Sequence, residues 1–432
     1  MSYQLISILV AIIPALGLVS GFSVAVTVPI FLLLTLYALQ GKLFINLQPV
    51  AIKNNLLSKW KLELMFGLWS LVTIFFSPNS LGSLGIYIQI SLIILIGFIV
   101  NSNIDTLAIN HFTVSRYFVI GMLAAVSIFV IEYFSYGMIT RGFRVIFQPK
   151  TSGHFFLFTL DRGCSLLSVF SWIVIGIFIQ YRKYFLALIY YLLIVYLLSI
   201  SDSLASFLAF IIGGGVLLSS RLLFLRSLQS VFLKLFTIAL ITGSICMPII
   251  SYKIAPYEAA NHYANFLPDS AKHRLFIWNF VANKIVEKPI IGHGFSSSRY
   301  YSQYYHTNNN KIITYNQWSF SLFPLHPHNN IMQILFETGI IGFLLFLSLL
   351  VKYLKQIGNL VISSIDKDNF SQTNSKMLNY TSICYAAFIN YYIIGMISFN
   401  IWQTWWVCTA FGAMILLQLL VRYSQSDLAG DT

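Results

Sequence analysis

The chain has 432 residues, of which 58% are hydrophobic and only 9% charged, with a formal net charge of +13. Continuous apolar runs near twenty residues long recur along it, which excludes a soluble protein and a membrane β-barrel and predicts an all-α polytopic integral membrane protein. The basic residues are spread between these runs without a sustained patch, so they indicate membrane topology and contact with membrane lipids rather than nucleic acid.

The apolar runs predict about twelve transmembrane helices. We expect a bundle of about nine helices over residues 1–252, a loop region with surface helices over 253–330, and a bundle of about three helices over 331–432. With a cytoplasmic N-terminus, nearly every short inner loop carries Lys or Arg, which leaves the loop 253–330 on the external face. The predicted spans are 3–20, 22–39, 61–76, 84–100, 117–136, 163–180, 184–200, 203–219, 235–252, 331–351, 379–398 and 403–421.

The sequence predicts no metal site. All four cysteines fall in apolar runs and lack the spacing of metal ligands, so we interpret them as packing residues. The external loop also lacks a paired acidic motif of the kind that supplies oxygen ligands to Mg²⁺ or Mn²⁺. The cysteines are Cys164, Cys246, Cys384 and Cys408.

Two arginines lie near the external face. Arg162 follows Asp161 at the edge of a predicted span, and Arg274 lies one turn into a helix predicted over 269–289, where Trp278 would suit the lipid interface. The guanidinium group offers a permanent charge and a planar fork that matches phosphate oxygens. Arg162 could instead pair with Asp161 or anchor the span at lipid headgroups, and the sequence leaves these alternatives open.

The segment KPIIGHGFSSSRYY (288–301) brings two glycines and a cation together. Gly292 and Gly294 flank His293, and Arg299 follows. Glycines allow close backbone approach, and their exposed N–H groups can cradle an anion, so Gly292, Gly294 and Arg299 are candidate substrate-binding residues. A plain turn is the alternative interpretation of the glycine pair.

The segment LFPLHPHNNIMQILFETGIIG (322–342) places costly polar residues beside a predicted span. Pro327 favours an extended residue before it, so the helix should begin just after it, with His328 at its external mouth. An imidazole with an ordinary pKa near 6.5 suits a general base, which makes His328 the candidate catalytic base. His326 lies beside it as a candidate substrate contact.

Three polar residues continue into that helix at steps of four. Asn329, Gln333 and Glu337 should share one face and point into the bundle. Asn329 is a further candidate substrate contact, and either His326 or Glu337 could orient the His328 ring. A buried hydrogen-bond network that only fixes helix packing is the alternative for this polar stripe.

Together these segments are similar to the O-antigen ligase family, membrane enzymes that share the Wzy C-terminal domain. Segments 160–172 and 274–299 resemble stretches found in members of that family, and specific similarity covers roughly 155–345. The family signature is His-Asn, nine residues, Gly, two residues and Gly, and this chain meets it with His328, Asn329, residues 330–338, Gly339 and Gly342.

The resemblance implies a fold like that of the GT-C membrane glycosyltransferases, in the bacterial inner membrane, with one large periplasmic loop. It implies metal-independent, inverting transfer of a glycan from undecaprenyl diphosphate to a sugar hydroxyl of lipid A–core, without a cofactor. By the same resemblance His328 is the catalytic histidine and Arg274 contacts the diphosphate. Many members carry an arginine in the turn that here reads Ser201-Asp202-Ser203. We expect Arg162 to supply that second positive charge, and a different organisation of the donor site is the alternative.

Three other functions stay open. An O-antigen polymerase or a protein O-glycosyltransferase of the same superfamily would use the same donor and differ only in its acceptor. A polysaccharide-lipid transporter would also suit about twelve spans, but transporters of this kind are built from internal repeats. The sequence contains no second copy of the His-Asn…Gly-Gly segment.

Overall fold

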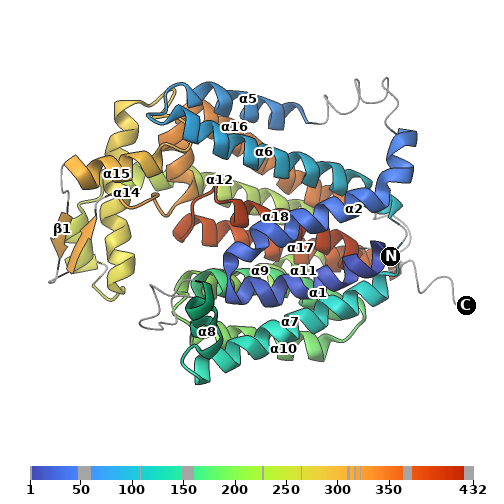
Figure 1. Ribbon diagram of the computed structural model, residues 1–432. Helices are drawn as coiled ribbons and strands as arrows, with labels where there is room; N and C mark the ends of the chain where they lie inside the picture. Colours follow the sequence, from blue (N-terminus) through green and yellow to red (C-terminus); the bar gives the residue numbers. More distant parts are fainter. Residues whose placement is uncertain are drawn as a thin grey trace, which may run out of the picture.

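The computed structural model describes residues 2–46, 60–107, 109–147, 160–225, 228–263, 265–308, 312–315, 318–321, 323–362 and 372–422. Helices dominate this part of the chain (Figure 1). The prediction of a helical polytopic membrane protein is confirmed, with one departure from an all-α fold. That departure is an antiparallel hairpin of β1 (Ile312–Tyr315) and β2 (Trp318–Ser321) within the long loop.

Every predicted span falls on a helix, but fewer than twelve of the described helices are both long and apolar enough to be candidate membrane spans. By length and composition, nine of the described helices are candidate membrane spans, and α1 and α10 are apolar but shorter. α5 has only 14 residues. The twelve helices on the predicted spans are α1 (Ser2–Val19), α2 (Val24–Asn46), α5 (Lys61–Ile74), α6 (Ser80–Asn103), α7 (His111–Phe134), α9 (Asp161–Gln180), α10 (Tyr184–Ser199), α11 (Leu204–Leu225), α12 (Gln229–Lys253), α16 (Asn330–Ile362), α17 (Gln372–Ile397) and α18 (Thr404–Leu417).

Eight further helical elements are described, and half of them belong to the long loop. The helix predicted over 269–289 is present as α14 (Asp269–Glu287). The others are η1 (Gly21–Ser23), η3 (Ile104–Thr106), α8 (Met138–Phe147), α13 (Pro256–Glu258), η6 (Ala259–Tyr263), α15 (Ser298–Asn308) and η7 (Gln418–Arg422).

The helices pack around two apolar cores. α9 is buried along nearly its full length in the first core, against α1, α7, α10, α11 and α17. The second core lies between α5, α12, α14 and α16. α17 contributes to both, since Ile383 belongs to the first core and Tyr385 to the second. α17 therefore lies between the two cores and packs against helices of both.

α16 is broken at Gly339, which has φ 63° and ψ −169°. The break leaves carbonyl groups without intrahelical donors, and a buried carbonyl needs another partner. Three successive carbonyls, those of residues 336–338, accept from outside the helix. Their donors are the His293 N–H at 2.8 Å, the Gly294 N–H at 2.9 Å and Trp69 Nε1 at 2.8 Å. The signature glycine thus lets a loop and α5 dock onto α16.

Gly339→Ala should destabilise the protein. A Cβ at Gly339 would lie 2.1 Å from the Ile290 carbonyl oxygen, and the positive φ disfavours any side chain. We expect a loss of stability of ~3 kcal/mol from clash and strain together, seen as a lower Tm of the purified protein in detergent. Gly85→Ala is the matched control, because a Cβ there meets nothing within 4 Å. Equal melting of the two variants would contradict the docking role of Gly339.

Candidate active site

The C-terminal end of α17 organises three side chains that the sequence singled out. The last carbonyls of a helix lack intrahelical partners and carry the negative end of its dipole. Three successive carbonyls there accept hydrogen bonds from side chains of other elements. The pairs are Asn329 Nδ2 to Met396 at 3.1 Å, Arg274 Nε to Ile397 at 2.9 Å and His328 Nδ1 to Ser398 at 2.8 Å. This end therefore fixes all three side chains and favours positive charge on two of them.

The hydrogen bonds of His328 define its tautomer. A carbonyl oxygen can only accept, so Nδ1 carries the proton and Nε2 keeps a free lone pair. The backbone N–H of His328 donates to Nδ1 of His326 at 3.2 Å, and the two ring centroids lie 4.2 Å apart. Burial, followed by the charge of Arg274, lowers the pKa of His328 to about 4. The imidazole is therefore neutral near pH 7, with Nε2 able to accept a proton.

The turn that carries His328 is held from several sides. His328 has φ 52°, a left-handed conformation that is uncommon outside glycine. Trp278 Nε1 donates to the Pro327 carbonyl at 3.1 Å, so Trp278 braces this turn instead of only facing lipid. Asn329 Oδ1 accepts from the Met332 N–H at 3.0 Å and caps α16, which begins just after the proline as predicted.

Arg274 reaches this turn from α14 with part of its donor capacity unused. Besides its Nε bond, Nη1 donates to the Ser270 carbonyl at 2.8 Å. Its other N–H groups have no protein partner within the described ranges. Burial lowers the pKa of the Arg274 guanidinium, and the nearby Asp161 carboxylate opposes that shift. An arginine remains charged under such conditions, so Arg274 presents free donors and a positive charge beside His328.

Arg162 brings a second guanidinium group from the start of α9. Its Cζ lies 4.3 Å from the centre of the Phe22 ring, so it stacks on η1. Asp161 instead accepts from Ser203 Oγ at 2.5 Å, which docks the 201–203 turn beside Arg162. The charges of Arg162 and Arg274 both lower the pKa of His326, after burial and the neighbouring imidazole. The two arginines and two histidines thus form one electrostatic group.

The predicted polar stripe points inward, but its members serve packing. Glu337 is fully buried and receives hydrogen bonds on both oxygens. Its donors are the Ser296 N–H, the Ser298 N–H and Oγ, Gln333 Nε2 and Trp402 Nε1. Gln333 also donates to Asn400 Oδ1 at 2.9 Å. None of these bonds reaches the His328 imidazole. The Ser398 carbonyl, and not Glu337 as one prediction had it, orients that ring.

The glycine pair has a structural role that the anion-cradle prediction did not anticipate. The Gly292 N–H donates to the Lys288 carbonyl at 3.1 Å, and the Gly294 N–H donates to the backbone carbonyl of Glu337 in α16 at 2.9 Å. Both glycines have positive φ, and a Cβ at Gly292 would meet the Gly339 nitrogen at 2.6 Å. Because these amides have internal partners, we leave Gly292 and Gly294 out of the proposed site. Asn329 is left out for the same reason, since its amide holds α17 and caps α16.

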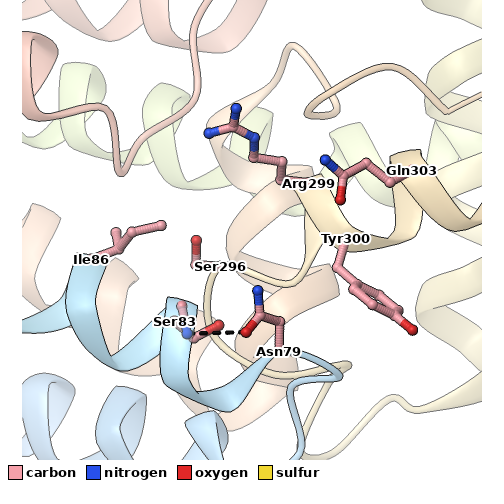
Figure 2. Close-up of a pocket in the computed structure, with 8 residues that line it drawn as sticks. Asn79, Ser83, Ile86, Ser296, Arg299, Tyr300 and Gln303 are labelled. Carbon is pink, nitrogen blue, oxygen red and sulfur yellow. Dashed lines mark hydrogen bonds between the residues drawn. The ribbon is translucent and has the colours of Figure 1, made fainter.

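Arg299 lies apart from the His328 group. It is exposed at the start of α15 and lines a pocket of about 270 Å³ between α15 and α6 (Figure 2). Within the described ranges, no hydrogen bond, ion pair or ring contact joins Arg299 to His326 or His328. The structure therefore separates the predicted cations into a pair near the imidazoles and a third in its own pocket.

Sequence reasoning missed the Ser398 carbonyl and the contact between Asp161 and Ser203. A backbone carbonyl has no sequence signal, and Asp161 and Ser203 are far apart along the chain. Within the described ranges, no cluster of three or more His, Cys, Asp or Glu side chains could hold a metal ion. Cys164 and Cys408 are free and buried in the first core, in line with a packing role.

Comparisons with known proteins agree with these features. Residues 187–347 match a family model described as O-antigen ligase. A Rickettsia felis protein named "Putative polysaccharide ligase" is 42% identical over 432 residues, covering 97% of this chain and 98% of that protein. A Rickettsia bellii protein of the same name is 42% identical over 428 residues, covering 95% of this chain and 96% of that protein.

Proposed function

This chain belongs to the O-antigen ligase family, and we propose that it transfers a glycan from undecaprenyl diphosphate to a sugar hydroxyl of lipid A–core. The proposal is carried by one observation: adjacent carbonyls at the end of α17 hold Arg274 and the neutral His328 side by side, and the charge of Arg162 acts on the neighbouring His326. The names of the relatives, which describe ligases of polysaccharide, support a ligase over a polymerase or a transporter. The family resemblance supports an inverting reaction that needs no metal.

The proposed step transfers one glycosyl group and one proton. The acceptor hydroxyl oxygen attacks the anomeric carbon of the donor sugar from the face opposite the diphosphate. His328 Nε2 takes the hydroxyl proton as the new carbon–oxygen bond forms. The bond from the anomeric carbon to the diphosphate oxygen breaks, and the electron pair leaves with the diphosphate. Arg274 and Arg162 stabilise the charge that develops on this leaving group in a site of low dielectric.

The site would face the periplasm. Arg162 stands at one end of α9, and the Arg182–Lys183 turn follows its other end. Basic residues mark cytoplasmic loops, so the Arg182–Lys183 end belongs inside and the Arg162 end outside. Arg162 on the external side does not conflict with this, because it has a specific place beside Phe22 and the histidines. The long loop that supplies Arg274 and His328 lies at the same external end.

Purified full-length protein tests the proposal directly. It is given lipid-linked glycan with lipid A–core or with a peptide as the acceptor, each with and without a chelator. We expect capped lipid A–core in both chelator conditions. Elongated lipid-linked glycan would instead indicate a polymerase, and glycosylated peptide a protein glycosyltransferase. Movement of the lipid-linked glycan across vesicles without transfer would indicate a transporter.

The pH dependence of transfer should report on His328. The base works only when neutral, so kcat/KM should be flat near neutral pH and fall in acid, with a midpoint near the pKa of about 4. Bound diphosphate adds negative charge beside Arg274 and raises the pKa of the imidazole. The midpoint for kcat, which reports the bound enzyme, should therefore lie above that for kcat/KM. A kcat/KM midpoint at or above the ordinary histidine pKa of about 6.5 would contradict this environment.

A further inference from the structure

The pocket around Arg299 is separate from the proposed catalytic group. Figure 2 shows side chains of α6 facing side chains of α15 and the loop before it across this pocket. Its volume of about 270 Å³ lies near the lower limit for small-molecule sites, which run from about 300 to 1,000 Å³. The lining residues are Asn79, Gly82, Ser83, Ile86, Ser296, Arg299, Tyr300 and Gln303. This space suits one sugar ring better than a lipid chain.

The lining is polar and carries a positive charge. Asn79 offers its amide Nδ2 and Ser296 its hydroxyl, which match the hydroxyls of a sugar, whereas the Ser83 hydroxyl already pairs with Ser77 Oγ at 2.8 Å. Arg299 is exposed, and its guanidinium group has no ion-pair partner within the described ranges. None of the lining residues is acidic. A ligand with an anionic substituent would therefore find a fork of donors without a competing carboxylate.

The helix starts around the pocket are already capped, so Arg299 must supply the anion recognition. Asn79 Oδ1 accepts from the Gly82 N–H at 3.0 Å at the start of α6 (dashed line in Figure 2). At the start of α15 the Ser298 N–H donates to the Glu337 carboxylate. These bonds use backbone donors that could otherwise hold an anion. Arg299 is the charged residue among those that line the pocket.

The pocket is fixed to the helix that carries His328. The N–H of Ser296 donates to Glu337 Oε2 at 2.9 Å, and Glu337 lies seven residues into α16 from its first residue, Asn330. At 1.5 Å per residue this is about 10 Å along the helix axis from the end that holds His328. An oligosaccharide can span such a distance, so one of its sugars could occupy the pocket while another meets the imidazole.

We propose that this pocket is a subsite for an anionic sugar of the acceptor glycan, an inference that rests on the proposed function. The donor diphosphate is assigned to Arg162 and Arg274, which reach the site from α9 and α14. The Arg299 pocket is built from α6 and α15 and shares no residue with that group. The acceptor is thereby held by a charged sugar away from the reacting hydroxyl, which places that hydroxyl near His328 Nε2.

The test compares two acceptors and four variants. The acceptors are a core oligosaccharide with phosphate monoesters and the same oligosaccharide after phosphatase treatment. With Arg299→Gln we expect the KM for the phosphorylated acceptor to rise about tenfold, the loss of one charge-assisted hydrogen bond, with kcat and donor KM unchanged. Asn79→Asp keeps the cap of α6 but repels an anionic ligand, so it should also raise the KM for the phosphorylated acceptor. Arg299→Lys keeps the positive charge, so it should retain part of the wild-type preference for the phosphorylated acceptor.

The fourth variant, Arg141→Gln, is the control, because Arg141 is an exposed arginine on α8 outside the pocket. Wild-type protein should prefer the phosphorylated acceptor, and Arg299→Gln should treat both acceptors alike. An unchanged preference in Arg299→Gln, or a rise in the donor KM alone, would overturn the acceptor subsite. Loss of the effect in nanodiscs rich in anionic lipid would also overturn it, because a lipid headgroup would then be the occupant.

Failure of the proposed function has a different outcome. If wild-type protein transfers nothing to either acceptor, the reaction assignment is wrong, and binding of the two oligosaccharides to the protein is measured by calorimetry. Tighter binding of the phosphorylated form that Arg299→Gln abolishes would still support the subsite. Equal binding of both forms by the wild type would reject it.

Discussion

Replacing His328 with asparagine should abolish glycan transfer while leaving the protein folded. Asparagine tolerates the left-handed backbone at φ 52° better than most residues. Its amide N–H can still donate to the Ser398 carbonyl, the partner that now holds Nδ1. What disappears is the free Nε2 lone pair. Loss of a general base lowers the rate by about 10² to 10⁴, measured as initial transfer velocity at saturating donor and acceptor.

His262→Asn is the matched control for this substitution. His262 is exposed in η6 of the same loop, so its replacement should leave the rate unchanged. The His328→Asn protein should elute as a single species and melt within a few degrees of wild type. More than about a tenth of wild-type activity in a correctly folded His328→Asn protein would show that another group accepts the proton.

Replacing Arg274 with lysine should also cripple transfer, although the charge is kept. Lysine is a point charge on a flexible stem and cannot reproduce the guanidinium fork that the Ile397 and Ser270 carbonyls aim. Removal of one preorganised donor costs about 10² to 10³ in kcat. We expect a loss in that range for Arg274→Lys and a larger one for Arg274→Gln. Arg141→Lys, an exchange on exposed α8, should have no effect.

Arg274→Gln carries a second readout that a purely structural role would not move. The charge of Arg274 lowers the pKa of His328, so its removal should shift the acid midpoint of kcat/KM upward. Full activity in Arg274→Lys would show that charge alone suffices. An unshifted midpoint in Arg274→Gln would show that Arg274 and His328 are not coupled.

Much of the membrane architecture was predictable because it depends on local pattern. Each apolar run forms a helix, since a chain in lipid must satisfy its own backbone hydrogen bonds. α14 was predictable from helical spacing and its terminal proline, and α16 begins where Pro327 requires. The signature from His328 to Gly342 was also visible. In this part of the chain, residue type and spacing alone carry the information.

The destinations of the polar groups were decided by tertiary structure. Glu337 could have turned toward His328, but the break at Gly339 lets a loop dock whose donors surround its carboxylate. The same docking engages the Gly294 N–H, which the glycine pattern predicts as an anion donor. The charge of Arg162 acts on His326 only because α9 starts beside η1 and the 201–203 turn.

The sequence by itself determined which apolar segments are helical and which histidine and arginines were candidates for chemistry. Only the tertiary structure decided that Asn329, Arg274 and His328 converge on the last carbonyls of α17. Every residue has a backbone carbonyl, so those acceptors leave no mark in the sequence. They become specific only when a helix end, with its unpaired oxygens and negative dipole, is packed against the residues that need them.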